Sequence, residues 1–381
     1  MKVSLTDICD FQGGTQPPKD EWIDQPAQGY VRMLQIRDFT QSDKNYIEYV
    51  KDTGKLKTCI EDDILIGRYG ASIGKILTGL AGAYNVAIVK TIPDEKVVSK
   101  KYLYWYLNSQ YFQRFISNVG SRAAQAGFNK NDLGAAQIPL VDKERQEEIC
   151  EVLEKANKLI SLRKQQLAKL DELIKARFVE MFGTFPANPF RWDTGKIQDV
   201  VSDVRYGSSR PAVEDGKYPY LRMNNITYSG ELDLRDTKRI DIPDSELDKC
   251  TVRRGDVLFN RTNSKELVGK TCVYNRDELM VLAGFVIRVR VNERIRSDVL
   301  SAFLNMDFSK RMLIGMCKTA IGQANINAKE LQNIDLYIPP IELQDQFVAL
   351  KNKIDQQKQT VQQSLEKLEL LKKALMQEYF G

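Results

Sequence analysis

Residues 142–182 read DKERQEEICEVLEKANKLISLRKQQLAKLDELIKARFVEMF, without a single glycine or proline. Apolar side chains recur in this stretch at every seventh position: Leu153, Ile160, Leu167, Ile174 and Met181. A seven-residue apolar repeat is typical of a coiled coil. About 40 residues of α-helix span about 60 Å. The pattern therefore predicts one long helix with an apolar stripe that needs a partner.

The same pattern returns further along the chain. Residues 341–379 also lack glycine and proline. Their apolar repeat consists of Phe347, Ile354, Val361, Leu368 and Leu375. Because both helices belong to one chain, we predict that they pair with each other, antiparallel, through their apolar repeats. The alternative is that each helix packs back onto its own globular domain.

The helices belong to a longer repeat. Six short matches occur in the same order along the chain, with offsets between 190 and 200 residues. They include Asp63-Ile64-Leu65 with Asp256-Val257-Leu258, Gly74-Lys75 with Gly269-Lys270, and Ile138-Pro139 with Ile338-Pro339. A small drift is expected from insertions in loops. The chain is therefore a tandem duplication.

Each copy joins a mixed globular domain to one of the helices. Residues 1–139 and 184–339 contain short runs rich in β-formers, broken by Gly, Pro, Asn and Asp, and followed by helical stretches. Residues 140–183 and 340–381 hold the two helices. The predicted fold class is α+β: two similar mixed α/β domains, separated by two long antiparallel coiled-coil helices, in a tandem repeat with pseudo-two-fold symmetry.

Composition limits the classes of function. The net charge of +5 permits a polyanionic partner without requiring one. The chain has no histidine, which excludes catalytic triads with an imidazole base and the common zinc sites that contain histidine. Its six cysteines are scattered, and we interpret them as reduced thiols of a cytoplasmic protein. We expect no signal peptide, because the first ten residues carry charges at Lys2, Asp7 and Asp10. We expect no membrane helix, because no apolar run approaches about 20 residues.

The motifs indicate no credible active site. The pairs Gly74-Lys75 and Gly269-Lys270 suggest a phosphate-binding loop, but such a loop needs a glycine five positions earlier, where Tyr69 and Ser264 stand. No glycine-rich cofactor loop follows a predicted strand, and no separated carboxylates suit a catalytic metal. We therefore predict a non-catalytic protein, with no catalytic residue, metal site or cofactor of its own.

Polar side chains recur around the expected loops of both copies. Arginine suits guanine, Asn or Gln suits adenine, and lysine binds phosphate, so these residue types fit a reader of DNA sequence. In the first copy the candidates are Arg32, Gln35, Arg37, Arg68, Tyr69, Ser72, Lys75, Arg122, Gln125, Asn129 and Lys130. In the second copy they are Arg222, Asn224, Asn225, Arg261, Thr262, Asn263, Ser264, Lys265, Lys270, Gln323, Asn325, Asn327 and Lys329. For each of them a solvated or turn-forming role is the alternative.

The loops between the repeated residues differ between the copies. The framework Asp-Ile/Val-Leu, then Arg, then Gly-Lys is kept, whereas segments 69–73 and 262–268 differ in length and residue type. A retained scaffold with divergent loops is expected of two readers of different short sequences. Unselected drift would produce the same pattern.

These features together resemble the specificity subunit of Type I restriction-modification systems, over essentially the full chain. The most specific segments are 218–226, YPYLRMNNI, and 254–264, RGDVLFNRTNS. The Ile-Pro pairs that precede both helices add to the resemblance. The first copy departs from the pattern, with Gly67-Arg68-Tyr69-Gly70 where the second has Asn260-Arg261-Thr262-Asn263.

The resemblance implies two target-recognition domains, residues 1–139 and 184–339, each reading one half of a bipartite, asymmetric DNA site in the major groove. The central helix (140–183) and the C-terminal helix (340–381) would set the length of the unread spacer and dock two methyltransferase subunits. Those subunits would methylate adenine, and motor-nuclease subunits would join for restriction. S-adenosylmethionine, ATP and Mg are thus expected on partner subunits only. Two other classes stay open from the residues alone: a standalone DNA-modifying enzyme, and a coiled-coil scaffold whose domains bind proteins.

Overall fold

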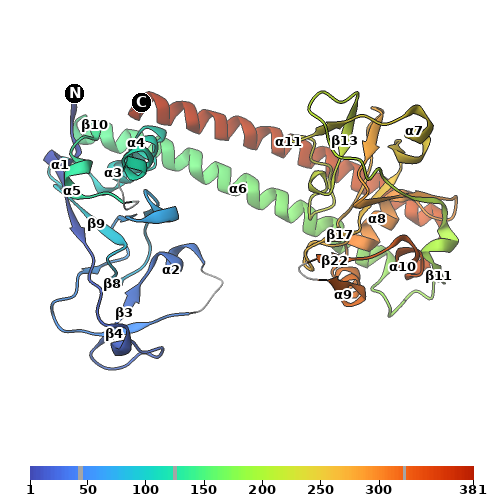
Figure 1. The fold of residues 1–381 in the computed structure, drawn as a ribbon, viewed down its shortest axis with the longest axis horizontal. Helices are drawn as coiled ribbons and strands as arrows, with labels where there is room; N and C mark the ends of the chain where they lie inside the picture. Colours follow the sequence, from blue (N-terminus) through green and yellow to red (C-terminus); the bar gives the residue numbers. More distant parts are fainter. Residues whose placement is uncertain (42–45, 123–126, 321–322) are drawn as a thin grey trace. The chain divides into compact units, whose positions relative to one another are not determined.

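The computed structural model describes residues 1–41, 46–122, 127–320 and 323–381. The chain forms two compact units. Unit 1 comprises Met1–Arg163 and Gln363–Gly381, and unit 2 comprises Lys164–Gln362. Two 40-residue helices, α6 (Lys143–Phe182) and α11 (Ile341–Phe380), each begin in one unit and end in the other (Figure 1).

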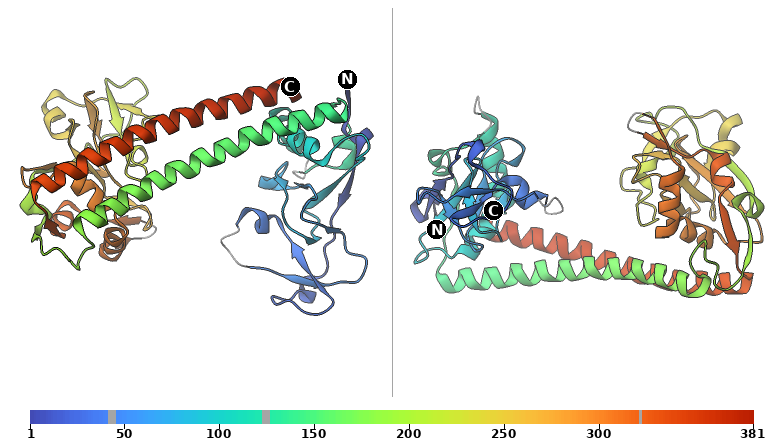
Figure 2. Two further views of the ribbon diagram at one scale, coloured as in Figure 1. Left: turned by 180° about the vertical axis from the view of Figure 1, so that it is seen from behind. Right: turned by 90° about the horizontal axis from the view of Figure 1, so that it is seen from below.

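The two helices pair antiparallel, as the apolar repeat predicts. In unit 1 the first turns of α6 lie beside the last turns of α11 (Figure 2), and Lys372 Nζ donates to Asn157 Oδ1 at 2.7 Å. In unit 2 the end of α6 lies beside the start of α11, where Lys358 forms an ion pair with Asp171. In each unit the two helix segments therefore run in opposite directions.

The apolar repeat is buried to different degrees along the helices. The buried members are Leu153, Ile160, Phe347, Ile354 and Val361. The partly exposed members are Leu167, Ile174, Met181, Leu368 and Leu375. Leu153 also belongs to the globular core of unit 1, so packing on the domain and pairing of the helices occur together. Within the described ranges, no helix combines the length and the apolar character needed to cross a membrane.

The globular part of unit 1 combines short strands and helices. Its strands are β1 (Lys2–Ser4), β2 (Cys9–Gly13), β3 (Tyr30–Leu34), β4 (Tyr49–Lys51), β5 (Thr58–Cys59), β6 (Leu65–Gly67), β7 (Ile76–Leu77), β8 (Gly82–Tyr84), β9 (Ile88–Pro93) and β10 (Gln137–Pro139). Its α-helices before α6 are α1 (Leu5–Ile8), α2 (Ile36–Thr40), α3 (Lys100–Leu107), α4 (Gln110–Arg122) and α5 (Lys130–Leu133).

The globular part of unit 2 also combines short strands and helices. Its strands are β11 (Asp193–Lys196), β12 (Val201–Tyr206), β13 (Tyr218–Leu221), β14 (Lys238–Ile240), β15 (Thr251–Val252), β16 (Val257–Asn260), β17 (Thr262–Asn263), β18 (Thr271–Val273), β19 (Met280–Leu282), β20 (Val286–Val291), β21 (Lys318–Ala320), β22 (Gln323–Asn325) and β23 (Asp335–Ile338). Its α-helices before α11 are α7 (Asp244–Cys250), α8 (Ser297–Asn305), α9 (Asp307–Met316) and α10 (Ala328–Gln332).

Two four-stranded sheets and one two-stranded sheet repeat between the units, and unit 2 has in addition the three-stranded sheet β17-β22-β21 among its described residues. The order β12-β20-β16-β18 repeats β2-β9-β6-β7, and β14-β13-β19-β15 repeats β4-β3-β8-β5. Each unit has one parallel pair in the second of these sheets, β3 with β8 and β13 with β19. The pairing of β1 with β10 likewise repeats as β11 with β23. The duplication in the sequence is therefore a duplication of the fold, and the predicted α+β class is confirmed.

The last turn of each long helix completes a globular core. Phe178 and Phe182 of α6 pack edge to face on Phe347 in unit 2, with ring centroids 5.6 and 5.4 Å apart. Phe380 of α11 packs on Tyr102 in unit 1, with centroids 5.2 Å apart. Buried aromatic rings contribute apolar area and favourable ring contacts. The aromatic residues of the last turn therefore anchor each helix in a core.

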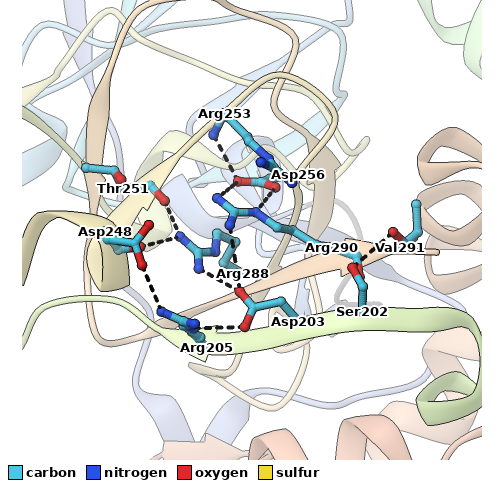
Figure 3. A network of polar contacts seen from close by, with 10 residues as sticks. All are labelled: Ser202, Asp203, Arg205, Asp248, Thr251, Arg253, Asp256, Arg288, Arg290 and Val291. Atoms are coloured by element: carbon cyan, nitrogen blue, oxygen red, sulfur yellow. Dashed lines mark hydrogen bonds and ion pairs between the residues drawn. The ribbon is translucent and has the colours of Figure 1, made fainter.

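A buried ion network joins the two main sheets of unit 2 (Figure 3). Arg288 of β20 is 1% exposed, and it donates to Asp203 Oδ2 at 2.7 Å and to the carbonyl of Thr251 in β15. Arg290 pairs with the buried Asp256 at 2.9 Å. Burial raises the pKa of Asp203, but the hydrogen bonds from Arg288 and a second arginine outweigh it and hold that pKa below its ordinary value. In this network each of the two arginines of β20 is therefore paired with an ionised aspartate.

Unit 1 makes the same connection with a lysine. Lys90 of β9 faces Leu65 across the sheet, as Arg288 faces Leu258. Its Nζ pairs with Asp63 at 3.0 Å and donates to the Thr58 carbonyl of β5 at 3.1 Å. A cation that connects the two sheets is therefore a repeated element of the fold, buried in unit 2 and partly exposed in unit 1.

Candidate nucleic-acid interface

One edge of each globular domain gathers the loops that follow the central strands. In unit 1 the turn between β8 and β9 connects the two sheets. Asn85 N–H donates to the Leu34 carbonyl at 3.2 Å, and Arg68 N–H donates to the Ala87 carbonyl at 2.8 Å. Tyr69 forms an isolated antiparallel β-bridge with Gly127, which belongs to a fourth segment. We call these four segments the loop edge of unit 1: residues 34–37, 68–72, 85–87 and 127–130.

The same hydrogen bonds build a loop edge in unit 2. Ala283 N–H donates to the Leu221 carbonyl at 2.8 Å, and Arg261 N–H donates to the Phe285 carbonyl at 3.0 Å. The Arg261 carbonyl in turn accepts from Ile326 N–H at 3.0 Å. The loop edge of unit 2 comprises residues 206–210, 221–225, 261–265, 283–285 and 325–329.

Arg68 and Arg261 occupy the same position in the two loop edges. Arg68 Nε donates to a backbone carbonyl at 2.9 Å, and the guanidinium lies 5.0 Å from the centre of the Tyr69 ring. Arg261 Nη2 donates to Asn325 Oδ1 at 3.1 Å, and its guanidinium lies 4.8 Å from the centre of the Tyr206 ring. A guanidinium has five N–H donors, and contact with a ring restrains its plane. Both arginines are therefore oriented while donors remain for a phosphate or a base.

Three polar side chains of unit 1 bind one buried carboxylate. Glu48 is 5% exposed, accepts from Gln35 Nε2 at 2.6 Å, and forms ion pairs with Arg37 and Lys19. Arg32 pairs with a different carboxylate at 3.3 Å. Contact with DNA would have to compete with these carboxylates, so Arg32, Gln35 and Arg37 are less available than their residue types suggest.

The turn after β13 separates a buried asparagine from an exposed one. Asn225 is 2% exposed, accepts from Arg222 N–H at 2.9 Å, and donates to the Asp233 carbonyl at 2.8 Å. Arg222 pairs with Asp236 at 3.0 Å. Asn224, the preceding residue, is exposed. The contacts of Asn225 favour a structural role, whereas the amide of Asn224 is free to face an adenine.

Lys270 and Thr262 are buried in unit 2. Lys270 is 7% exposed, its Nζ donates to the Met223 carbonyl at 2.9 Å, and burial lowers its pKa. Thr262 is 6% exposed. Lys75, which holds the position of Lys270 in unit 1, is exposed. The burial favours a structural role for Lys270 and Thr262 and leaves Lys75 as the accessible lysine of the repeated pair.

Two candidate asparagines cap helices. The side-chain oxygen of Asn129 accepts from Asp132 N–H at 3.1 Å at the start of α5, and that of Asn327 accepts from Glu330 N–H at 2.9 Å at the start of α10. Lys130 pairs with an exposed aspartate. Capping satisfies backbone N–H groups of the first turn. Helix capping is therefore sufficient to explain why an asparagine stands at this position in both units.

The remaining candidates differ in exposure. Exposed side chains belong to Tyr69, Lys265 and Lys329. Partly exposed side chains belong to Ser72, Asn263, Ser264 and Asn325. Arg122 and Gln323 lie in α4 and β22, and their side chains are outside the described part of the structure. Gln125 lies outside the described residues.

Sequence reasoning missed two aromatic residues of the loop edge. The Tyr206 hydroxyl accepts from Ala328 N–H at 2.8 Å, which fixes the ring beneath Arg261. Phe285 is 54% exposed. No motif marks either residue. For Phe285, the repeat offered a signal, because it aligns this large aromatic residue with the small Ala87.

A buried lysine of unit 2 replaces a neutral side chain of unit 1. Lys310 Nζ donates to the Gly269 carbonyl at 2.7 Å, as Gln113 Nε2 donates to the Gly74 carbonyl at 2.9 Å. Burial, aided by repulsion from two neighbouring lysines, lowers the pKa of Lys310 to about 7. The ordinary lysine pKa is about 10.4. Between those values the unfolded chain binds more protons than the folded one, so stability rises with pH.

Lys310→Gln is expected to flatten this pH dependence, because glutamine keeps the hydrogen bond to Gly269 and does not titrate. Urea denaturation at several pH values between about 7 and 10 measures it. The natural chain should gain stability across the window relative to the variant. Parallel curves for the two proteins would contradict a depressed pKa at Lys310.

Comparison with known proteins identifies the family to which a chain with this fold and these loop edges belongs. The family model described as Type I restriction modification DNA specificity domain matches the chain twice, at residues 1–172 and 189–370. The chain belongs to this family. The resemblance drawn from segments 218–226 and 254–264 is thereby confirmed.

Individual relatives carry the same description. The Type I restriction enzyme MjaVIII specificity subunit of Methanocaldococcus jannaschii is 24% identical over 400 residues, covering 98% of this chain and 90% of that protein. The putative type I restriction enzyme MjaX specificity subunit of the same organism is 26% identical over 196 residues, which is 50% of this chain. The type I restriction enzyme EcoKI specificity subunit of Escherichia coli is 20% identical over 278 residues, which is 69% of this chain. The matches span 46% of the MjaX protein and 60% of the EcoKI protein.

Solved structures share the fold. The S subunit of a Type-I restriction-modification system from M. genitalium covers 100% of this chain with a TM-score of 0.55 and 15% identity, over 96% of its own length. A chain from a study of complex assembly and conformational transition of the type I R-M system gives a TM-score of 0.60 at 17% identity, with 100% and 97% coverage. At such low identity the likeness describes the fold alone.

Proposed function

We propose that the chain is the sequence-specific DNA-recognition subunit of a Type I restriction-modification complex. Each loop edge reads one half of a bipartite, asymmetric site. The repeated loop edge is the observation that carries the proposal. One scaffold positions an arginine at the same place in both units, against the ring of Tyr69 in unit 1 and of Tyr206 in unit 2, while the loops beside it differ. Membership of the specificity-domain family supports the same function.

Within this proposal some side chains contact phosphates and position the protein, and others contact bases and determine the sequence that is recognised. Arg68 and Arg261 are repeated and oriented, so they suit a phosphate contact that both half-sites share. Asn224, Asn263 and Asn325 belong to the loop edge of unit 2 and are exposed or partly exposed. Their amides suit adenine in the major groove. Sequence preference would thus come from the loops that differ, and affinity from the arginines that recur.

We infer that the chain supplies no chemistry of its own. Two methyltransferase subunits dock on α6 and α11 and methylate adenine, and motor-nuclease subunits join them for restriction. S-adenosylmethionine, ATP and Mg²⁺ belong to those subunits. The absence of histidine from the sequence is consistent with this division. Purified chain incubated with DNA and either S-adenosylmethionine or Mg²⁺ is expected to show no turnover; methylation or cleavage would favour a standalone enzyme.

The function is tested by mapping adenine methylation in cells. Cells that express this chain with its methyltransferase partner are compared, by long-read sequencing, with cells that lack the chain. We expect a new split motif with one modified adenine in each half and a fixed gap. If a verified complex produced no motif, a scaffold that binds proteins would become the better interpretation.

Arg261→Ala is expected to weaken binding to every DNA sequence by about tenfold, because a lost charge-assisted phosphate contact is worth about one order of magnitude. It should also reduce the slope of log Kd against log salt concentration by about 0.9. Arg261→Lys keeps the charge and should keep the slope. Fluorescence anisotropy with the assembled complex over a salt series measures both quantities.

Arg254→Ala is the matched control for Arg261→Ala. Arg254 is an exposed arginine of unit 2 that pairs with Asp277 outside the loop edge. We expect the Arg254→Ala complex to keep the natural affinity and slope. A loss in Arg261→Ala confined to one base position would mean that Arg261 reads a base and does not anchor a phosphate.

A further inference from the structure

The turns that connect β8 with β9 and β19 with β20 are closed by equivalent hydrogen bonds but carry different side chains, Asn85-Val86-Ala87 in unit 1 and Ala283-Gly284-Phe285 in unit 2. A hydrogen bond closes each turn, at 3.0 Å within 85–88 and at 2.9 Å within 283–286. The third residue of each turn accepts the N–H of the repeated arginine. That residue is Ala87 in unit 1 and Phe285 in unit 2. The repeat thus holds an apolar side chain at the same point of both loop edges.

Phe285 is rigidly held yet exposed. Its side chain is 54% exposed, whereas Val286, the next residue, is fully buried. Its carbonyl accepts from Arg261 N–H at 3.0 Å, and Gly284 N–H donates to the Ser208 carbonyl at 2.7 Å. Single exposed apolar residues are common on protein surfaces, so exposure alone identifies no site. Here the backbone on both sides of the ring is tied to the loop edge, which gives the ring a defined place among the candidate readers.

The surroundings of Phe285 are polar. Arg261 lies on the Tyr206 ring, and Arg261 Nη2 donates to Asn325 Oδ1 at 3.1 Å. In the major groove every base pair offers hydrogen-bond donors and acceptors, but among the unmodified bases only thymine offers a methyl group. An apolar side chain within a set of polar readers matches that pattern.

We propose that Phe285 contacts the C5 methyl group of a thymine in the half-site read by unit 2, and so determines one base pair of that half-site. The inference rests on the proposed function and adds a specificity-determining residue to it. Alanine and phenylalanine both contact thymine methyl groups in DNA complexes. Ala87 therefore suits the same contact in unit 1, with a shorter side chain.

The test uses the assembled complex and DNA duplexes that carry its mapped motif. Each thymine of the motif is replaced in turn by deoxyuridine, which lacks only the methyl group. With the natural chain, one replacement in the half-site read by unit 2 is expected to raise Kd about fourfold, the effect of losing one buried methyl contact. With Phe285→Ala, the thymine and deoxyuridine duplexes should bind equally at that position.

Two control variants separate the methyl contact from general effects of substitution. Phe285→Leu keeps an apolar side chain and is expected to keep part of the fourfold difference. Leu279→Ala removes an exposed apolar side chain at the other end of β19, outside the loop edge, and should keep the full difference. Urea denaturation of each variant confirms that it folds.

Two results would overturn the inference. The difference between the thymine and deoxyuridine duplexes could persist in Phe285→Ala, or no deoxyuridine replacement could raise the Kd of the natural chain. In each case the complex still binds its motif, so the proposed function survives. A complex that binds no motif at all would remove the proposed function and this inference with it.

Discussion

Replacing Arg288 with alanine is expected to lower the free energy of unfolding by about 3–5 kcal/mol, the usual effect of removing one partner of a buried ion pair. The side chain is 1% exposed, and it bonds Asp203 and backbone carbonyls at Asp248 and Thr251. Its loss removes the most buried partner of Asp203 and a donor to both carbonyls, and it creates a cavity between the sheets. Urea denaturation of the full chain measures the change, and hydrogen exchange in β16 and β20 assigns it to unit 2.

Two variants sharpen the interpretation. Arg288→Lys should lose much less stability, because Lys90 makes the equivalent connection in unit 1. Arg205→Ala removes an exposed partner of the same Asp203 and should stay close to the natural chain, since solvent screens the pair. If Arg288→Ala were as stable as Arg205→Ala, the network of Figure 3 would not be what joins the sheets.

Lengthening both long helices by three heptads is expected to lengthen the spacer of the recognised DNA site by about nine or ten base pairs. Twenty-one residues of helix add about 32 Å, and one turn of B-DNA is about 34–36 Å. Whole heptads preserve the apolar repeat. Insertions after Arg163 in α6 and after Gln362 in α11 fall at the boundaries between the units. Methylation mapping should return the two original half-sites with the wider gap.

A one-heptad insertion in both helices provides the contrast. It adds about 10 Å, or about three base pairs, which turns the second half-site by about a third of a turn around the duplex. Specific methylation should therefore fall sharply. A three-heptad protein that still methylated the original spacing would contradict the proposal that helix length sets the spacer.

The helices and the duplication were predictable because both depend on local patterns. The apolar repeat predicted helices at 142–182 and 341–379, and the structure has them at Lys143–Phe182 and Ile341–Phe380. A helix without glycine or proline is specified by residues three, four and seven apart, all visible in the sequence. The order of matched segments likewise required no knowledge of contacts.

The state of individual loop residues was not predictable from such patterns. Glu48 lies 11 to 29 residues from Lys19, Gln35 and Arg37, and it reaches them in a structure in which β3 is paired with β4. Lys75 and Lys270 hold the same position in the repeat, yet the first is exposed and the second is buried and bonded to the turn after β13. Residue type suggested contact with DNA in each case, and tertiary contacts decided which side chains are free to make it.

The burial of Phe380 in the core of unit 1 has a consequence for synthesis on the ribosome. Residues 1–163 emerge first, but the ring that packs on Tyr102 is made more than two hundred residues later. At about 5–20 residues per second, that interval is roughly 10–40 s. During this time the first domain has an open apolar site, and unit 2 can complete its own core with Phe178, Phe182 and Phe347 beforehand. The half of the protein that is translated first is therefore the half that finishes folding last.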